Sequence, residues 1–180
     1  MKKLIISMLI VSSLGFTGCM SAAAKQVQNN NIQYYFTRAK QSPDLQLIKI
    51  INSTQSNLDI AIYSLTKQSI VDSIIKAKNR GVKVRIITDK MESKSKSEKK
   101  ILILLQGIPV KINSHSGLMH LKVTIADKNV VTTGSYNYTN NATRVNDEVL
   151  VIIKDVNVAK DFENEFNGMW SNENDYINYN

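Results

Sequence analysis

The chain has 180 residues, of which 43% are apolar, and this is enough for one ordinary globular domain with its own hydrophobic core. Lysine and arginine number 23 against 15 aspartate and glutamate. The resulting formal charge of +8 favours anionic partners such as nucleic acid or acidic lipid headgroups. The single cysteine excludes an internal disulfide, so the domain must be stable through packing alone.

The N-terminal residues have the pattern of an export signal. A basic start at Met1–Lys3 precedes an apolar stretch, residues 4–16, which is too short to span a bilayer as a helix. Residues 1–24 are therefore expected to be a signal peptide, residues 25–31 a polar tether and residues 32–175 the folded domain. Removing this leader removes two lysines and no acid, so the mature chain remains basic.

Two endings of the signal compete. Phe16-Thr17-Gly18-Cys19 resembles a bacterial lipobox, in which Cys19 would be lipidated, whereas Ala22-Ala23-Ala24 is a small-residue cleavage site. We prefer the lipobox, because Cys19 is the only cysteine and lies just past the apolar stretch. The protein is accordingly expected to be exported, either as a membrane-tethered lipoprotein of the cell envelope or as a secreted protein.

The first half of the domain alternates between strands and helices. Ser42-Pro43-Asp44 predicts a helix start, with a capping serine, a proline at the first helical position and an acid in the first turn. Thr66 is a candidate cap for the next helix, which Gly81 would end. The expected strands are 32–36, 58–62, 82–86 and 110–112, and the expected helices have apolar positions at 45–51, 70–75 and 101–105.

The second half contains closely spaced strands. Residues 119–126 and 129–133 predict two strands around a tight Asp127-Lys128 turn, and residues 149–153 predict another. A closing helix carries Val158, Phe162, Phe166 and Trp170 on one face. The chain as a whole predicts a single-domain α/β fold, with a mixed, largely parallel β-sheet flanked by helices on both faces.

A histidine and a lysine share one face of an expected strand. His120 and Lys122 are two residues apart, so both side chains point to the same side. Leu121 points to the other side and is expected to enter the core. A phosphate at this face would meet an imidazole that can act as nucleophile or acid/base, together with a cationic clamp.

Further polar residues follow the hairpin. Ser135 and Asn137 are again two residues apart, directly after Gly134, which permits a close approach of the backbone. Glu148 opens the next apolar strand, where a lone acid could hold the imidazole in one tautomer. Each feature is weak alone, and their combination at fixed spacing indicates a site for phosphate chemistry.

These residues resemble the signature of a known family. His120-x-Lys122-x4-Asp127 matches the HxKx4D motif of the phospholipase D superfamily, and Gly134-Ser135-x-Asn137 with Glu148 fits the same pattern. The resemblance covers about residues 32–172, and the most similar group is the short, single-motif bacterial endonucleases of the Nuc type. Other segments that resemble the family are 116–120, 57–66 and 166–170.

The resemblance implies a covalent mechanism. His120 would attack phosphorus and form a phosphohistidine intermediate. Lys122 and Asn137 would bind the non-bridging phosphate oxygens with help from Ser135, and Glu148 would orient the imidazole. Asp127 sits at the hairpin turn, away from the strand face, and is expected to have a structural role. The family needs no metal, and we expect no cofactor here.

The reaction implied by the resemblance needs two histidines. The chain has one motif, and its only other histidine, His115, is followed at the required position by Gly117 instead of lysine. The second catalytic histidine must then come from another copy of the chain. We therefore expect a symmetric homodimer with one composite site on the two-fold axis.

The expected function is that of a metal-independent, non-specific endonuclease that cleaves DNA, RNA or both. A phospholipase D-type lipid hydrolase is an alternative that would suit membrane tethering. An envelope protein that binds nucleic acid without catalysis is a second alternative, which the complete motif disfavours. Candidate cations for a nucleic-acid track are Lys94, Lys96, Lys99, Lys100, Arg38, Lys83, Arg85 and Arg144, although the pattern of the four lysines favours a solvated helix face.

Overall fold

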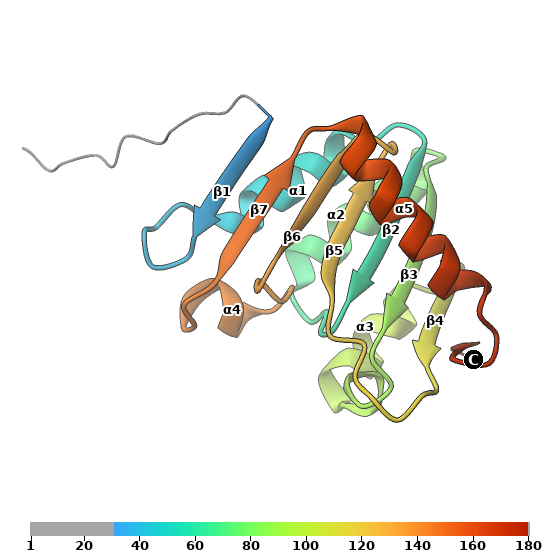
Figure 1. Ribbon diagram of the computed structural model, residues 1–180. Helices are drawn as coiled ribbons and strands as arrows, with labels where there is room; N and C mark the ends of the chain where they lie inside the picture. Colours follow the sequence, from blue (N-terminus) through green and yellow to red (C-terminus); the bar gives the residue numbers. More distant parts are fainter. Residues whose placement is uncertain (1–30, 180) are drawn as a thin grey trace, which may run out of the picture.

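The computed structural model describes residues 31–179 (Figure 1). The expected signal peptide, including Cys19, lies outside the described residues, as does the expected tether except for its last residue. Within the described range, no helix combines the length and the apolar character needed to cross a membrane.

Strands and helices alternate through β4, and β5 and β6 then follow each other in a hairpin. The elements are β1 (Ile32–Phe36), α1 (Pro43–Ser53), β2 (Asn57–Ile62), α2 (Gln68–Asn79), β3 (Lys83–Thr88), a 3-10 turn (Glu92–Lys94), α3 (Lys96–Leu104), β4 (Val110–Asn113), β5 (Lys122–Ala126), β6 (Val130–Gly134), α4 (Asn140–Arg144), β7 (Val149–Ile153), α5 (Val156–Ser171) and β8 (Tyr176–Asn178).

All eight strands form one mixed sheet, in the order β1-β7-β6-β5-β2-β3-β4-β8. Only β2 with β3 and β3 with β4 pair in parallel, and the other five pairs are antiparallel. The α/β class and the mixed sheet are as predicted, but the expectation that the sheet is largely parallel is wrong. Only β5 and β6 form a short hairpin, whereas the antiparallel pairs β1–β7, β2–β5 and β4–β8 join strands that are distant in the chain. The alternation of strands and helices along the sequence does not indicate the direction of such distant pairs.

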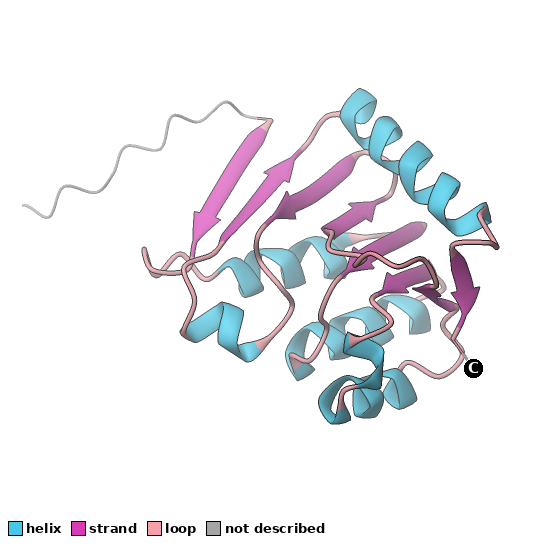
Figure 2. Ribbon diagram, turned by 60° about the horizontal axis from the view of Figure 1, so that its bottom comes forward, coloured by secondary structure: helices cyan, strands magenta, loops and turns pink. Residues whose placement is uncertain are grey.

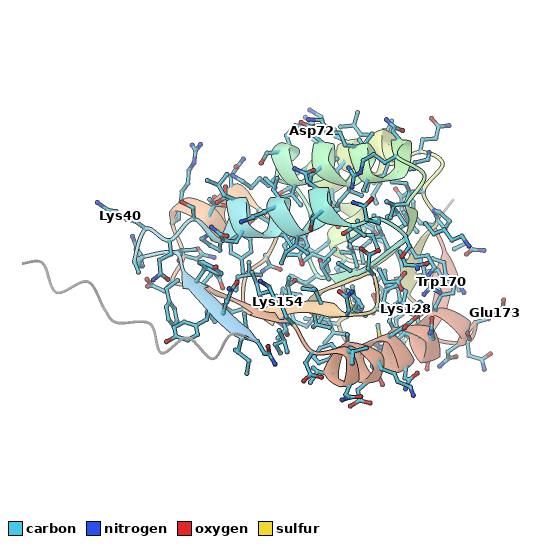
Figure 3. The ribbon with its side chains drawn as sticks, turned by 90° about the horizontal axis from the view of Figure 1, so that it is seen from above. Lys40, Asp72, Lys128, Lys154, Trp170 and Glu173 are labelled. Atoms are coloured by element: carbon cyan, nitrogen blue, oxygen red, sulfur yellow. The ribbon has the colours of Figure 1, made fainter. Side chains whose placement is uncertain are left out.

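The helices form a layer on each side of the sheet, as expected. Helix α5 covers one face, and the remaining helices lie on the other (Figures 2 and 3). The larger core packs α1, α2 and α3 against residues such as Ile60 and Ile86, and the smaller core packs Phe166 and Met169 of α5 against Val123 and Ile125. Each fully buried aliphatic side chain stabilises the fold by about 1.5–3 kcal/mol.

Two helix starts differ from the sequence prediction. Pro43 occupies the first turn of α1 as expected, but Ser42 has a left-handed backbone (φ 50°) and its hydroxyl caps nothing. Thr66 does not cap α2 either, because the helix begins at Gln68 after Lys67. The backbone N–H groups of Thr66 and Lys67 both donate to the Tyr138 carbonyl at 2.9 Å, so a tertiary contact fixes the segment before the helix.

Candidate active site

A pocket of about 460 Å³ opens at one end of the central strands, where β2 and β6 end and β5 and β7 begin. Its lining brings together five of the six site residues expected from the motif, which are separated by up to 28 positions in the chain. The lining residues are His120, Lys122, Gly134, Ser135, Asn137 and Glu148. The sixth expected residue, Asp127, lies at the opposite end of β5.

His120 lies two residues before β5, and not inside the strand as predicted. Strand-like pairing nevertheless continues through this segment, because the Tyr63 N–H donates to the Leu121 carbonyl at 2.8 Å. The imidazole is exposed and therefore open to a substrate. Leu121 is 41% exposed, so the expectation that it enters the core is wrong, because it lies before β5 at the open end of the sheet.

Tyr63 supports both members of the His-x-Lys pair. Its ring centroid lies 4.6 Å from that of His120, with the rings tilted by 58°. The Lys122 ammonium lies 5.0 Å from the centre of the same tyrosine ring. Burial and the negative charges of Glu92 and Asp89 raise the pKa of Tyr63, so the phenol stays neutral at physiological pH.

Lys122 is buried, with its ammonium at the floor of the pocket. One of its N–H groups donates to the His120 carbonyl at 2.7 Å, which leaves two donors for a ligand. Burial lowers the pKa of Lys122, and the nearby Glu148 carboxylate acts in the opposite direction. A phosphate oxygen arriving at this ammonium would supply the negative charge that the buried cation lacks.

Gly134 lets β6 pass directly beside β7. Its φ of +133° disfavours other residues, and a Cβ atom here would lie 2.2 Å from the Val149 carbonyl oxygen. The Ser135 N–H donates to this same carbonyl at 3.1 Å, while the Ser135 hydroxyl accepts from the Val149 N–H at 3.2 Å. Ser135 is thereby fixed at the rim of the pocket.

Asn137 carries an unpartnered polar atom. Its side-chain oxygen is buried and has no hydrogen-bond partner within residues 31–179. The residue lies between Tyr136 and Tyr138, both of which are fully buried and fix the segment. A buried polar atom without a partner costs free energy, and an amide oxygen can only accept, so this atom lacks a hydrogen-bond donor.

Glu148 lines the pocket opposite the strand that carries Lys122. Its carboxylate accepts from the Asn146 side chain at 2.9 Å, and its backbone N–H donates to the Thr37 hydroxyl at 3.0 Å. Within the described residues it shares the pocket with His120 without a hydrogen bond between the two side chains.

Asp127 stabilises the hairpin turn at the far end of β5. Asp127 and Lys128 both have a left-handed backbone, with φ values of 50° and 58°, which is uncommon without glycine. The Asp127 carboxylate accepts from the backbone N–H groups of Gln55, Ser56 and Asn57. Burial works against ionisation, but these hydrogen bonds hold the pKa of Asp127 below its ordinary value. Asp127 therefore joins the turn to the start of β2 through these hydrogen bonds.

Asp89, which the sequence pattern did not single out, fixes the segment ahead of His120. It is fully buried, and its carboxylate accepts from the Met119 N–H at 2.9 Å and from the Met91 N–H at 2.7 Å. The Asn113 side chain donates to the Gly117 carbonyl at 2.8 Å in the same loop. His115 lies outside the pocket and packs its ring edge-on against Tyr176, at 5.7 Å between centroids.

The expected cationic residues are distributed over different parts of the fold. Arg85 is tied to Asp59 at 2.7 Å and lies over the rings of Phe166 and Trp170, so it belongs to the packing of α5 on the sheet. The other candidates are exposed, on β3, on the 3-10 turn and α3, in the β1–α1 loop and on α4. Within residues 31–179, His, Cys, Asp and Glu side chains form no group of three that could hold a metal ion.

The fold and the pocket together define a phospholipase D-like domain. The family model described as "Cardiolipin synthase, PLD-like domain" matches residues 47–170. This range is more than half of the chain and includes every residue that lines the pocket. The chain belongs to the phospholipase D superfamily.

Solved and curated relatives agree with this assignment. The crystal structure of Nuc, a phospholipase D family member from Salmonella typhimurium, superposes with a TM-score of 0.76 at 26% identity, covering 82% of this chain and 97% of that one. A mitochondrial cardiolipin hydrolase of Xenopus tropicalis is 30% identical over 69% of this chain, which spans 60% of that relative. A phospholipase D of Rickettsia prowazekii is 28% identical over 85% of this chain and 80% of its own length.

Proposed function

We propose that the protein is a metal-independent phosphodiesterase that cleaves nucleic acid, DNA or RNA, through a phosphohistidine intermediate. The observation that carries this proposal is the pocket itself. It combines the exposed imidazole of His120, the buried ammonium of Lys122 and the side-chain amide of Asn137, whose NH2 group can donate to an oxygen. These are a nucleophile and two groups that bind phosphate oxygens.

In the first step, a ring nitrogen of His120 attacks phosphorus. The nitrogen–phosphorus bond forms while the bond to one ester oxygen breaks, and His120 of the partner subunit gives that oxygen a proton. Lys122 and Asn137 bind the non-bridging oxygens as charge develops on them, with Ser135 at the rim. Glu148 orients the imidazole and stabilises it when it carries positive charge.

In the second step, water attacks the phosphohistidine. The water gives a proton to His120 of the partner subunit, its oxygen bonds to phosphorus, and the nitrogen–phosphorus bond breaks. The products are a phosphomonoester and an alcohol, and both histidines return to their starting states. A homodimer supplies the second histidine, because each chain has one motif.

Lipid hydrolysis is the second candidate function. Leu118 and Leu121 are close to His120 in the chain and are 53% and 41% exposed, so they form an exposed apolar rim on the segment that carries His120. Such a rim suits the acyl region of a phospholipid, and the names of the cardiolipin hydrolase and phospholipase D relatives point the same way. We favour nucleic acid because of the positive charge and the similarity to Nuc at nearly full length.

A substrate panel tests these candidates. The purified protein is incubated, with chelator present, with plasmid DNA, single-stranded DNA, RNA, phosphatidylcholine and cardiolipin. We expect nucleic acid to be cleaved, and this activity to be abolished by His120→Ala but retained by His115→Ala, the matched change at the other histidine. Turnover of lipid alone would establish the second candidate. Salt-sensitive nucleic-acid binding without cleavage would indicate a binding protein instead.

We also propose that the protein is exported and anchored in the cell envelope through Cys19. The support is the basic, apolar and lipobox pattern of the leader. In the producing cell, Cys19→Ser should move the protein from the membrane fraction to the soluble exported fraction. An unchanged distribution would favour cleavage at Ala22-Ala23-Ala24.

A further inference from the structure

Two further pockets continue from the candidate active site across the surface. The nearer pocket, of about 240 Å³, shares Ser135 and Glu148 with the active site and is bordered by Phe36 and Arg38. Arg38 also lines the next pocket, of about 470 Å³. Each pocket shares lining residues with the next, so the three lie side by side and define a path from His120 past the β1–α1 loop to α4.

The β1–α1 loop is hydrogen-bonded to the segment between α4 and β7 along this path. The Thr37 hydroxyl donates to the Asn146 carbonyl at 2.8 Å, and the Thr37 N–H donates to the Glu148 carbonyl at 3.1 Å. Figure 1 shows the loop and α4 at the same end of the sheet. These hydrogen bonds join the β1–α1 loop to the residues just before β7, and so fix the position of the path relative to the active site.

The nearer pocket offers an aromatic surface. Phe36 ends β1, at the edge of the sheet, and is 46% exposed. The pocket is smaller than the 300–1,000 Å³ of sites for drug-sized ligands, and so fits a group the size of one ring system. An exposed aromatic ring next to a phosphate site is the usual stacking surface for an unpaired nucleobase.

The farther pocket offers cations. Lys40 and Arg144 line it, and within residues 31–179 neither has an acidic partner (Figure 3 shows Lys40 projecting outward). Its one acid, Asp44, is 3.3 Å from the ammonium of Lys67, which compensates its charge.

Arg38 connects the two pockets. It pairs with Asp147 at 2.9 Å, and both of these side chains are more than half exposed. A surface pair of this kind contributes only about 0–1 kcal/mol, so a phosphate can replace the carboxylate at little cost.

We propose that this path, formed by Phe36, Arg38, Lys40 and Arg144, binds a single strand of nucleic acid beside the scissile phosphate. The base adjacent to the scissile phosphate stacks on Phe36, and the following phosphates bind to Arg38 and then to Lys40 and Arg144. The proposal rests on the nuclease function above and adds a preference for single strands, because a base inside a duplex is already stacked. The lysines of the 3-10 turn and α3 line none of these three pockets and have no place in the path.

Binding measurements separate the path from general positive charge. All variants carry His120→Ala, so that binding is measured without cleavage, and the probe is a short fluorescein-labelled single-stranded DNA followed by anisotropy at several salt concentrations. The stacking variant is Phe36→Leu, which keeps an apolar side chain, with Phe36→Tyr as the variant that restores the ring. The charge variant is Lys40→Gln/Arg144→Gln, and its matched control is Lys99→Gln/Lys100→Gln, which removes the same charge from exposed positions of α3.

We expect Phe36→Leu to weaken binding by about fivefold or more, and Phe36→Tyr to bind within twofold of the parent. Lys40→Gln/Arg144→Gln should lower the slope of log affinity against log salt by about 1.4, since each phosphate contact on a single strand contributes about 0.7. The control should keep the parent slope. The path would be overturned if the charge variant and its control lowered the salt slope equally. It would also be overturned if Phe36→Leu bound the DNA as tightly as the parent.

The outcome is distinguishable from failure of the proposed function. If the protein with His120 intact cleaves single-stranded DNA while the path variants bind like the control, the path is wrong and the nuclease function stands. If it cleaves no nucleic acid while the path variants lose binding as expected, the path stands as a binding surface and the nuclease function is wrong.

Discussion

At the scale of single residues, the site depends on positions where no other side chain fits. Gly134→Ala would place a Cβ atom 2.2 Å from the Val149 carbonyl oxygen, at a φ that alanine rarely adopts. We expect the free energy of unfolding to fall by roughly 2–4 kcal/mol, measured by urea denaturation. Gly168→Ala is the control, because nothing lies within 4 Å of its added methyl and alanine favours the α5 helix by up to about 1 kcal/mol. Similar destabilisation by both changes would contradict this account.

The residues of the pocket could be predicted to different extents. The fixed spacing of His120, Lys122, Ser135, Asn137 and Glu148 identified them, and they line one pocket. Tyr63 could not be predicted, since its contact with His120 depends on β2 pairing with β5 across about sixty residues. Asp89 was missed for the same reason, because its hydrogen bond to Met119 joins two loops that are distant in the chain.

At the scale of elements, a buried carboxyl group joins α3 to the sheet. Glu98 lies in the first turn of α3, is fully buried, and accepts from the Thr88 hydroxyl at 2.7 Å and the Leu65 N–H at 3.3 Å. Burial raises the pKa of Glu98 from 4.5 to about 7, although these hydrogen bonds oppose the shift, and the nearby Glu92 adds to it. The folded protein therefore keeps a proton that the unfolded chain releases at lower pH.

This proton makes the stability depend on pH. The contribution of Glu98 is fully present below pH 4.5 and is lost as the pH rises to about 7, by about 3 kcal/mol over this interval. We expect Glu98→Gln to remove most of that decline when urea denaturation is followed across the interval. Glu165→Gln, on an exposed position of α5, should keep the parent pH profile. If Glu98→Gln kept the parent dependence of the free energy of unfolding on pH, the Glu98 carboxyl would not be the cause of the decline.

Whole elements were predicted more reliably than their ends. Hydrophobic periodicity placed β1 to β7, α1, α2, the end of α3 and the closing helix α5. The five-residue α4 and the three-residue β8 were missed, because segments this short carry too few residues for a period to be recognised. The two caps failed for different reasons: the left-handed backbone of Ser42 gives no side-chain cap, and Thr66 lies in a segment whose N–H donates to the Tyr138 carbonyl, before the helix begins.

At the scale of the whole molecule, the proposed mechanism requires two chains for each site. Mixing wild-type protein with an excess of His120→Ala, followed by denaturation and refolding, would place most wild-type chains in heterodimers that contain one essential histidine. We expect activity per wild-type chain to fall in proportion to heterodimer formation, because each composite site needs both imidazoles. The same mixture made with His115→Ala is the control and should retain activity. Heterodimers that keep wild-type activity would refute the composite site.

The sequence by itself determined the family, the α/β class and the residues of the pocket, because motif spacing and strand alternation are local properties of the chain. Only the tertiary structure decided that most strand pairs are antiparallel, that Tyr63 and Asp89 support the His120 segment, and that Arg85 belongs to the packing of α5. Only the tertiary structure also joined Phe36 and Arg38 to the active site through β7. Pairing between distant strands determines each of these contacts. Hydrophobic periodicity along the chain predicts strands and helices, but it does not indicate which strands pair with each other.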